Sequence, residues 1–372
     1  MNPKVSIILP FFNAERYLRT ALDSVASQFS RDFECICVDD GSTDGSAEIA
    51  ASLQRQDGRF RLIRIEHGGA GAARNEGIAA ANGECLAFLD ADDMYEPDFL
   101  QEMLGEYERQ EKCDIVVCEA WRYSGEKGVL EPAAQCFVAN RFEVADYLNC
   151  TPGMPWNKLF SHAFVDRHGF RFLDLPSCED VGFVYPALAM ATRIGAVRKR
   201  LVRHRVDNSG SLEHSKCGVG TTVFYDAYLT VRNQLRERGA YGRVREAFIR
   251  RVGTALQYNA SVLRDLVGLR AFYDRVMPNA VRDFELLGDV ASAFDEELCE
   301  MCHCTFEEYV LRRLRQARQL PAVKAECKRL AVRHQALMKS ASFRLGRALT
   351  FLPRQVRDAC RSGFATMRNP VR

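Results

Sequence analysis

The stretch at residues 83–93, GECLAFLDADD, joins a short apolar run to three carboxylates. The run at 86–89 is typical of a buried strand in a parallel sheet. Such a strand delivers Asp90, Asp92 and Asp93 to its carboxyl end, where open α/β sheets bind their ligands. A solvated acidic turn before the next helix is the alternative, and this stretch alone does not separate the two.

The spacing of the carboxylates points to a metal. Asp90 and Asp92 lie two residues apart, so in extended backbone their side chains share one face. Two hard oxygen ligands on one face suit Mg²⁺ or Mn²⁺ held jointly with the phosphates of a substrate.

The length and composition of the sequence indicate a globular chain of more than one domain. It has 372 residues, 47% of them hydrophobic and 27% charged, and this length predicts two or three domains. We expect no signal segment at the N-terminus and no membrane span, because no apolar run approaches about 20 residues. The fourteen scattered cysteines indicate buried thiols in a reducing cytoplasm.

Charge is distributed unevenly. Residues 310–372 contain 16 Lys or Arg and 2 Asp or Glu, a net +14, so the first 309 residues carry −12 of the total of +2. Between Val323 and Ala341 apolar residues recur at steps of three and four with basic residues between them, which predicts a basic amphipathic helix. Such a helix fits an anionic membrane surface; a helix packed on the body or a dimer seam is the alternative. Nucleic acid is not expected as a partner, because no reading motif is present.

The first 90 residues alternate between two patterns. Apolar runs predict strands at 5–9, 33–38, 60–65 and 86–89, and helical spacing predicts helices at 14–28, 45–56 and 72–81. This alternation predicts an α/β fold with a doubly wound, mostly parallel sheet. Right-handed crossovers then place Pro10, Asp39 and Asp90 along one edge.

The remainder is less regular. Further strands are expected at 114–118, 120–123, 194–197 and 201–206, a polar loop at 125–134, a helix at 141–150, and mainly helices after residue 221. We expect a catalytic domain at 1–212, a helical region at 213–320 and a basic amphipathic tail at 321–372.

The loop after the first strand excludes two nucleotide-binding motifs. It reads Pro-Phe-Phe-Asn at 10–13 and has neither the Gly-x-Gly-x-x-Gly pattern nor a phosphate-binding Walker loop. Phosphates must therefore be held in another way, and a metal on Asp92 is the available means.

Four motifs together resemble the family 2 glycosyltransferases. They are VSIILPFFN at 5–13, VDDGSTDGS at 38–46, ARNEG at 73–77 and FLDADD at 88–93. The resemblance covers about residues 3–210 and implies an A-type glycosyltransferase fold that binds a nucleotide-sugar, most often a UDP-sugar.

The resemblance also implies roles for the donor site. Pro10 would line the base pocket, Asp39 would accept a hydrogen bond from the uracil ring, and Arg74 would flank the uridine. Asp90 would approach the ribose or the metal, and Asp92 would ligate the metal. Turn and cap chemistry suits Asp40, Ser42 and Asp44 better than ligand contacts do.

The pair Glu179-Asp180 follows the metal motif by about 90 residues. Carboxylates at a helix start are often only favourable partners of the helix dipole. The resemblance instead implies that Asp180 is the general base of an inverting transfer and that Glu179 supports it. It implies likewise that Arg205 and Ser211 donate to the diphosphate, although the spacing of this segment departs from the commoner one.

Trp156 and Lys158 have two interpretations. An aromatic ring beside a basic residue suits a sugar face, whereas a buried Trp that anchors a helix is slightly favoured. The role of Lys158 stays open.

We therefore expect an inverting glycosyltransferase that uses Mg²⁺ or Mn²⁺. It would move a sugar from a nucleotide-sugar, UDP or alternatively GDP, to a glycan or lipid-linked acceptor in surface polysaccharide synthesis. We expect it in the cytoplasm, with peripheral contact to the membrane through the tail. A sugar nucleotidyltransferase and a degenerate, non-enzymatic scaffold are the alternatives.

Overall fold

The computed structural model describes residues 2–125, 128–133, 146–151, 153–208, 222–263, 266–286 and 296–312. The chain divides into two compact units between Leu298 and Cys299. All elements below lie in the first unit, except that the last helix crosses this boundary. The domain limits expected at residues 212 and 320 fall outside the described ranges and stay predictions.

The strands belong to a single sheet. They are β1 (Val5–Phe11), β2 (Phe33–Asp39), β3 (Phe60–Arg64), β4 (Cys85–Phe88), β5 (Met94–Tyr95), β6 (Ile115–Ser124), β7 (Val129–Pro132), β8 (Lys158–Ser161) and β9 (Ile194–Arg205). Their order is β3-β2-β1-β4-β8-β6-β9-β5, and β7 pairs with β6. Strands β1 to β4 are parallel, as predicted. The predicted α/β fold is confirmed, and the sheet becomes mixed where β8 runs antiparallel to both β4 and β6.

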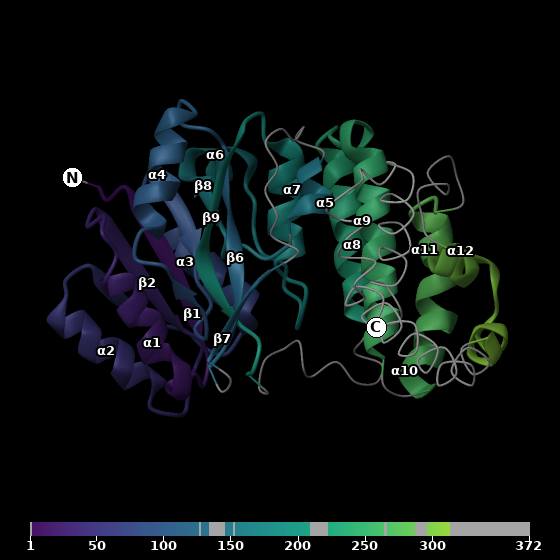
Figure 1. The fold of residues 1–372 in the computed structure, drawn as a ribbon, viewed down its shortest axis with the longest axis horizontal. Helices are drawn as coiled ribbons and strands as arrows, with labels where there is room; N and C mark the ends of the chain where they lie inside the picture. The colour runs from purple at the N-terminus through teal and green to yellow at the C-terminus, as the bar shows by residue number, and fades with distance from the viewer. Residues whose placement is uncertain are drawn as a thin grey trace, which may run out of the picture. The chain divides into compact units, whose positions relative to one another are not determined.

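Helices cover the sheet and continue beyond it (Figure 1). They are α1 (Glu15–Ala26), α2 (Ser46–Gln56), α3 (Gly69–Ala80), α4 (Phe99–Arg109), α5 (Tyr147–Cys150), α6 (His162–His168), α7 (Val181–Met190), α8 (Val223–Glu237), α9 (Tyr241–Val262), α10 (Leu266–Ala271), the π-helical η4 (Phe272–Val276), α11 (Met277–Asp283) and α12 (Glu296–His303). The predicted helical region is therefore present over α8 to α11. Of the helix expected at 141–150, α5 covers the end, and residues 141–145 lie outside the described ranges, as does the segment 321–372.

The first strand shows why both faces of the sheet carry helices. Val5, Ile7 and Leu9 are fully buried in one core with residues of α1. Ile8 points to the opposite face, where a β-carbon built on Gly77 of α3 would come within 2.4 Å of its Cγ2. Because side chains alternate across a strand, a strand buried on both faces reads as a continuous apolar run.

Pro10 lies inside β1, whereas the sequence predicts that it ends the strand. The Ile8 carbonyl accepts a hydrogen bond from Leu89, on the β4 side, and the Phe11 carbonyl accepts one from Asp40, on the β2 side. By this alternation the missing N–H of Pro10 falls on the β4 side, where β4 has already ended at Phe88. A proline is tolerated there because it removes no ladder bond.

One irregularity explains two breaks that the sequence predicts wrongly. Cys118 pairs with Val197, but Glu119 already pairs with Arg200, so β9 bulges between its two partners. The pattern of hydrophobic residues is interrupted there in both strands, although β6 and β9 are each continuous. The loop expected at 125–134 is also wrong in part, because β7 returns along β6.

No helix within the described residues is long and apolar enough to span a membrane. Five cysteines in or beside the strands, Cys35, Cys37, Cys85, Cys113 and Cys118, are buried free thiols.

Candidate active site

Four strands end at one edge of the sheet and collect polar side chains there. β1, β2 and β4 are parallel. β9 runs with β6, which is antiparallel to β8, itself antiparallel to β4, so β9 points the same way as β4. The residues that follow these strands therefore meet at the edge where α/β sheets bind ligands.

The two aspartates at the end of β2 fasten loops. Asp39 is fully buried, and its carboxylate accepts from the Ser42 backbone N–H at 2.8 Å and from Arg64 Nε at 2.9 Å. Asp40 accepts from the backbone N–H groups of Gly68 and Gly69 at 2.8 and 2.9 Å.

Ser42 and Asp44 make bonds of the same kind. The Ser42 hydroxyl accepts from the Asn13 N–H, and the Asp44 carboxylate accepts from the N–H groups of Glu15 and Ser46. These bonds are the turn and cap chemistry that the sequence favoured for Asp40, Ser42 and Asp44.

An aromatic pair stands exposed beside this turn. Phe12 is 44% exposed and stacks on His67 with ring centroids 4.2 Å apart. His67 Nδ1 lies 2.9 Å from an Asp40 carboxylate oxygen, which orients the imidazole. Pro10 lies buried two residues before Phe12. Sequence reasoning missed this pair, for which the two consecutive phenylalanines after the first strand were the available signal.

The carboxylates after β4 form a turn. The Asp93 N–H donates to the Asp90 carbonyl at 3.1 Å, so the expectation of an extended segment with Asp90 and Asp92 on one strand face is wrong. Asp92 is held by Asn208, whose Nδ2 donates to Oδ2 at 2.8 Å. Burial raises the pKa of the Asp92 carboxyl, the Asn208 bond opposes this, and the charge of Asp90 adds to it.

Arg74 joins two acidic segments that are 89 positions apart in the chain (Asp90 and Glu179). Its Nη2 lies 2.6 Å from Asp90 Oδ1 and its Nη1 lies 2.7 Å from Glu179 Oε1. The Arg74 side chain is only 6% exposed, and its guanidinium faces the Phe172 ring at 5.2 Å. A buried cation between two carboxylates fixes their separation, because each charge offsets the desolvation of the others.

Two backbone features bring Glu179 to Arg74. A β-carbon on Gly71, one turn before Arg74 in α3, would lie 2.4 Å from the Leu173 carbonyl oxygen and 3.3 Å from Glu179 Cβ, so only glycine permits this approach. Cys178 has φ of 59°, a left-handed conformation that is uncommon for a residue with a side chain. Such conformations cluster at functional sites.

Asp180 sits at the N-terminus of α7, directly after Glu179. Burial raises the pKa of its carboxyl to about 7, the charge of Glu179 adds to the rise, and the charge of Arg74 opposes it. A carboxylate with this pKa takes up and releases protons near neutral pH, as a general base requires.

The end of β9 contacts the Asp90–Asp93 turn. His204 Nδ1 lies 3.1 Å from an Asp93 carboxylate oxygen, and the Arg205 N–H donates to the other at 2.8 Å. Burial raises the pKa of Asp93 to about 6, and His204 opposes that rise. Sequence reasoning missed this pairing, because nothing in the spacing links residue 93 to residue 204.

The Arg205 side chain already contacts other side chains and a backbone carbonyl of the protein. Its guanidinium lies 4.7 Å from the Tyr17 ring centroid and 4.9 Å from that of Tyr123, and its Nε donates to the Asp92 carbonyl at 3.1 Å. A role toward phosphate stays a prediction for Arg205. Ser211, predicted with it, lies outside the described residues.

Trp156 is a buried anchor. It is 1% exposed and stacks on His204 with centroids 5.1 Å apart, so it has no open face for a sugar. Lys158 is also fully buried, and its Nζ donates to the Met154 carbonyl and to Asn157 Oδ1.

Asp90 and Asp92 fit a divalent metal that arrives with a diphosphate. No group of three or more His, Cys, Asp or Glu suited to a metal occurs among the described residues. Mg²⁺ in proteins is commonly bound by one or two carboxylates together with substrate phosphates. The raised pKa of Asp92 agrees with this, since a cation would favour the ionised form of a buried carboxylate beside Asp90.

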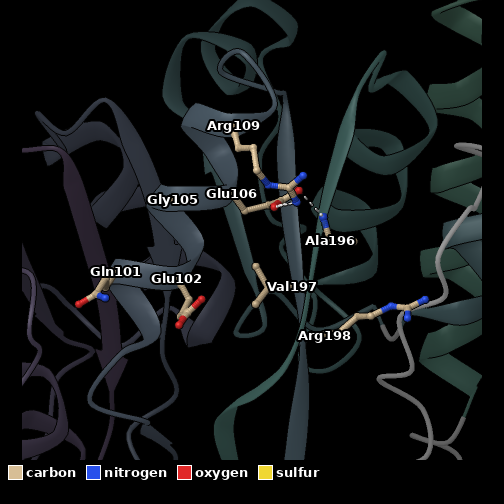
Figure 2. A pocket seen from close by; sticks show the side chains of 8 residues that line it. All are labelled: Gln101, Glu102, Gly105, Glu106, Arg109, Ala196, Val197 and Arg198. Carbon is tan, nitrogen blue, oxygen red and sulfur yellow. Dashed lines mark hydrogen bonds and ion pairs between the residues drawn. The ribbon is translucent and has the colours of Figure 1, made fainter.

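Figure 2 shows a hollow of about 380 Å³ between α4 and the start of β9. Glu106 crosses it, bonded to Arg109 and to the Ala196 N–H. Arg198 also lines it. This hollow lies at the opposite end of β9 from His204, so it is separate from the carboxylate edge.

The chain matches known proteins over this same region. Residues 6–172 match the model of glycosyl transferase family 2. EpsH of Bacillus subtilis, named a putative glycosyltransferase, is 32% identical over 251 residues, which are 63% of this chain and 72% of EpsH. TuaG of the same organism, named a putative teichuronic acid biosynthesis glycosyltransferase, is 38% identical over 112 residues, 30% of this chain and 44% of TuaG.

The fold matches a solved structure. Residues 1–349 of S. aureus TarS superpose with a TM-score of 0.64 at 21% identity, covering 84% of this chain and 92% of that structure. A second TarS structure, in complex with UDP, gives a TM-score of 0.62 over 81% of this chain and 86% of that one. The match in sequence to EpsH, in addition to the family model, places the chain: it belongs to glycosyltransferase family 2 and is a glycosyltransferase.

Proposed function

We propose that this glycosyltransferase moves a sugar from a UDP-sugar to a hydroxyl group of a glycan or lipid-linked acceptor, with inversion, and that Asp180 is its base. The observation that carries the proposal is the Arg74 bridge. It ties the carboxylate turn after β4 to Glu179, the neighbour of Asp180. The donor and the acceptor hydroxyl would therefore meet beside a single buried arginine.

The main group that this reaction requires from the protein is a base. The acceptor oxygen attacks the anomeric carbon, the bond from that carbon to the diphosphate oxygen breaks, and the hydroxyl proton passes to Asp180. No enzyme nucleophile is needed in such a single displacement. A carboxylate whose pKa is raised to about 7 binds this proton more firmly than an ordinary one and is still ionised in part at neutral pH.

On the donor side, Asp92 and Asp90 are the residues that would hold Mg²⁺ or Mn²⁺. When bound with the diphosphate, the cation supplies charge neutralisation for the departing nucleoside diphosphate. Arg205, and Ser211 beyond the described residues, would add donors to the phosphates. The bond from Arg205 to the Asp92 carbonyl would have to rearrange for this.

The nucleobase would lie at the end of β1 and β2. Phe12 offers an exposed ring, stacked on His67, and aromatic faces of this kind bind bases by stacking. Asp39 would contribute through the acceptor capacity left beside its two bonds, and Pro10 would shape the floor. UDP is the first nucleotide to test, because TarS, the fold neighbour, has been solved with UDP.

The acceptor and the location of the enzyme are inferred more broadly. TuaG is named for teichuronic acid biosynthesis, which supports an acceptor in a surface polymer. The net charge of +14 at residues 310–372 would place the enzyme on the anionic cytoplasmic face of the membrane.

The base is tested by Asp180→Asn. The variant keeps the size of the side chain but does not accept a proton, so transfer should fall by about 10²–10⁴-fold. UDP affinity, measured by calorimetry, should stay within about twofold, because Asp180 is not part of the donor edge. Transfer that survives the substitution would show that another group is the base.

The donor is tested by thermal stability with UDP, GDP and CDP, each with and without Mn²⁺. A ligand that binds only the folded protein raises the melting temperature by mass action. A shift with UDP that requires Mn²⁺ is expected. A shift with GDP alone would replace the donor, and no shift with any nucleotide would contradict the donor site.

A further inference from the structure

Arg251 of α9 is a partly buried cation, and no ion pair joins it to a carboxylate of the described residues. Its Nε is inaccessible to solvent and has no hydrogen-bond partner. Its Cζ lies 5.4 Å from the centroid of the Tyr185 ring, which offsets part of the cost of burial. Arginine does not lose its proton in proteins, so it cannot escape that cost by becoming neutral, as lysine can.

The polar groups around Arg251 also lack partners. Tyr185 of α7 is fully buried and its hydroxyl makes no hydrogen bond, and the same is true of the Thr151 hydroxyl at the end of α5. The ring of Tyr228 in α8 lies 5.8 Å from that of Tyr185. Burial, together with Tyr228, raises the pKa of Tyr185 well above its usual range, so the phenol keeps its proton and remains a donor.

These groups lie on or beside four helices, α5, α7, α8 and α9. α5 packs on both α7 and α9, and α8 packs on both as well. A β-carbon built on Gly153, two residues after Thr151, would lie 3.1 Å from the Tyr185 hydroxyl oxygen. A partly buried cation and unbonded hydroxyl groups on adjoining helices are complementary to an anion with several oxygen atoms.

The cluster lies close to the proposed base. α7 begins directly after Asp180, and Tyr185 is five residues further on, about one and a half helical turns. Val181 and Tyr185 both border Gly153, at 3.0 and 3.1 Å from the same built β-carbon. All of these groups belong to α5, α7, α8 and α9, and not to the strand edge assigned to the donor.

We propose that Arg251 and Tyr185, with the Thr151 hydroxyl, bind an anionic oxygen group, a phosphate or a carboxylate, carried by the acceptor. The inference rests on the proposed function, because it takes Asp180 as the base. α7 then presents one end to the acceptor hydroxyl and its next turns to the anionic group. The substrate class is accordingly an acidic glycan or a sugar phosphate, and neutral acceptors bind less well.

The site is tested by titrating inorganic phosphate into the full-length protein by calorimetry. Saturating UDP and Mg²⁺ occupy the donor site, and the ionic strength is held constant. Wild type should bind phosphate, and Arg251→Met should weaken binding at least tenfold. Arg250→Met is the matched control, since Arg250 is the neighbouring residue, is exposed and pairs with Glu246; it should bind as wild type does.

Folding is kept apart from binding by a second variant. Tyr185→Phe keeps the ring and removes only the hydroxyl, and it should weaken phosphate binding about threefold or more with an unchanged melting temperature. Arg251→Met should melt no lower than wild type, because an apolar side chain replaces a partly buried charge that has no counter-ion among the described residues. Equal phosphate affinity in wild type and Arg251→Met would overturn the site.

The source of the anion is tested with a matched pair of sugars. p-Nitrophenyl glucuronide should displace phosphate and lose affinity in Arg251→Met, whereas p-nitrophenyl glucoside should be indifferent to that substitution. If the glucuronide does not displace phosphate bound at Arg251, the assignment to an acceptor is wrong. Phosphate binding in a wild-type protein that transfers no sugar would count against the proposed function and not against the anion site.

Discussion

The aspartates after β2 and the carboxylates around Arg74 have the same side chains in opposite surroundings. Asp39 and Asp40 receive backbone N–H groups and an arginine in short hydrogen bonds, which fasten the loops after β2 and β3. Asp92 and Asp180 are partly buried beside other carboxylates, and the pKa of each is raised. The first arrangement uses charge to hold backbone, and the second keeps charge available for a ligand or a proton.

The largest effect is expected from replacing Arg74, the single cation that pairs with both Asp90 and Glu179. Arg74→Met leaves the buried Glu179 and the partly buried Asp90 without their counter-charge, so the free energy of unfolding should fall by about 3–5 kcal/mol. Transfer should be lost with it, and Arg74→Lys should recover only part of both. Urea denaturation measures the change, with the exposed Arg19→Met, which pairs with Asp23, as control. Equal stability of the two methionine variants would show that the bridge does not hold the site.

The metal site gives the next largest effect. Asp92→Asn removes the negative charge that would hold the cation and should reduce transfer by about 10²-fold or more. The stabilisation of the protein by UDP with Mn²⁺ should fall to the level seen with UDP and a chelator, and this readout does not require turnover. A Mn²⁺-dependent UDP shift that survives in Asp92→Asn would move the metal to other residues.

The loop-holding aspartates should behave differently. Asp40→Asn turns an NH₂ group toward one of the two backbone N–H donors, so stability should fall by about 1–3 kcal/mol. The transfer rate of the folded enzyme should change little. The comparison between the two sets of carboxylates fails if Asp40→Asn abolishes transfer while its urea midpoint matches that of wild type.

The smallest effect is a shift in pH dependence. Asp180 must be ionised to accept a proton, so kcat/KM should rise as pH increases through about 7. After burial, the charge of Glu179 contributes most to the raised pKa, so Glu179→Gln should lower the pKa of Asp180 and move this rise to lower pH. The exposed Glu102→Gln is the control for net charge. A rise that stays in place, or moves to higher pH, would contradict the coupling.

Local sequence was sufficient for the first half of the fold. The runs of β1, β2 and β4 predicted parallel strands because each strand is buried on both faces and therefore has a continuous apolar sequence. β3 is an edge strand and only partly buried, and it was predicted from its shorter apolar pattern. β8 and β7 were not predicted. Each is four residues long. Their partners lie far along the chain or across a turn, so the local periodicity of hydrophobic residues does not predict the pairing.

The candidate site residues were named from the sequence in two ways, and their roles stay predictions. The four family-like motifs named Pro10, Asp39, Arg74, Asp90 and Asp92. The distance of about 90 residues from the metal motif named Glu179 and Asp180. Which of them touch is a different matter. The bond from Arg74 to Glu179 spans 105 residues, and it depends on a close approach at Gly71 that sequence spacing does not express.

The sequence by itself determined the α/β class, the parallel half of the sheet and the family, because these depend on periods and motifs within short segments. Only the tertiary structure decided that Arg74 binds two acids, that Asp93 pairs with His204, and that Arg251 is partly buried with no counter-charge among the described residues. Each of these depends on the solvent exposure and the charge of residues that are brought together from distant parts of the chain. Burial and charge pairing arise only when the chain folds, and they are also what raises the pKa of Asp180 to about 7.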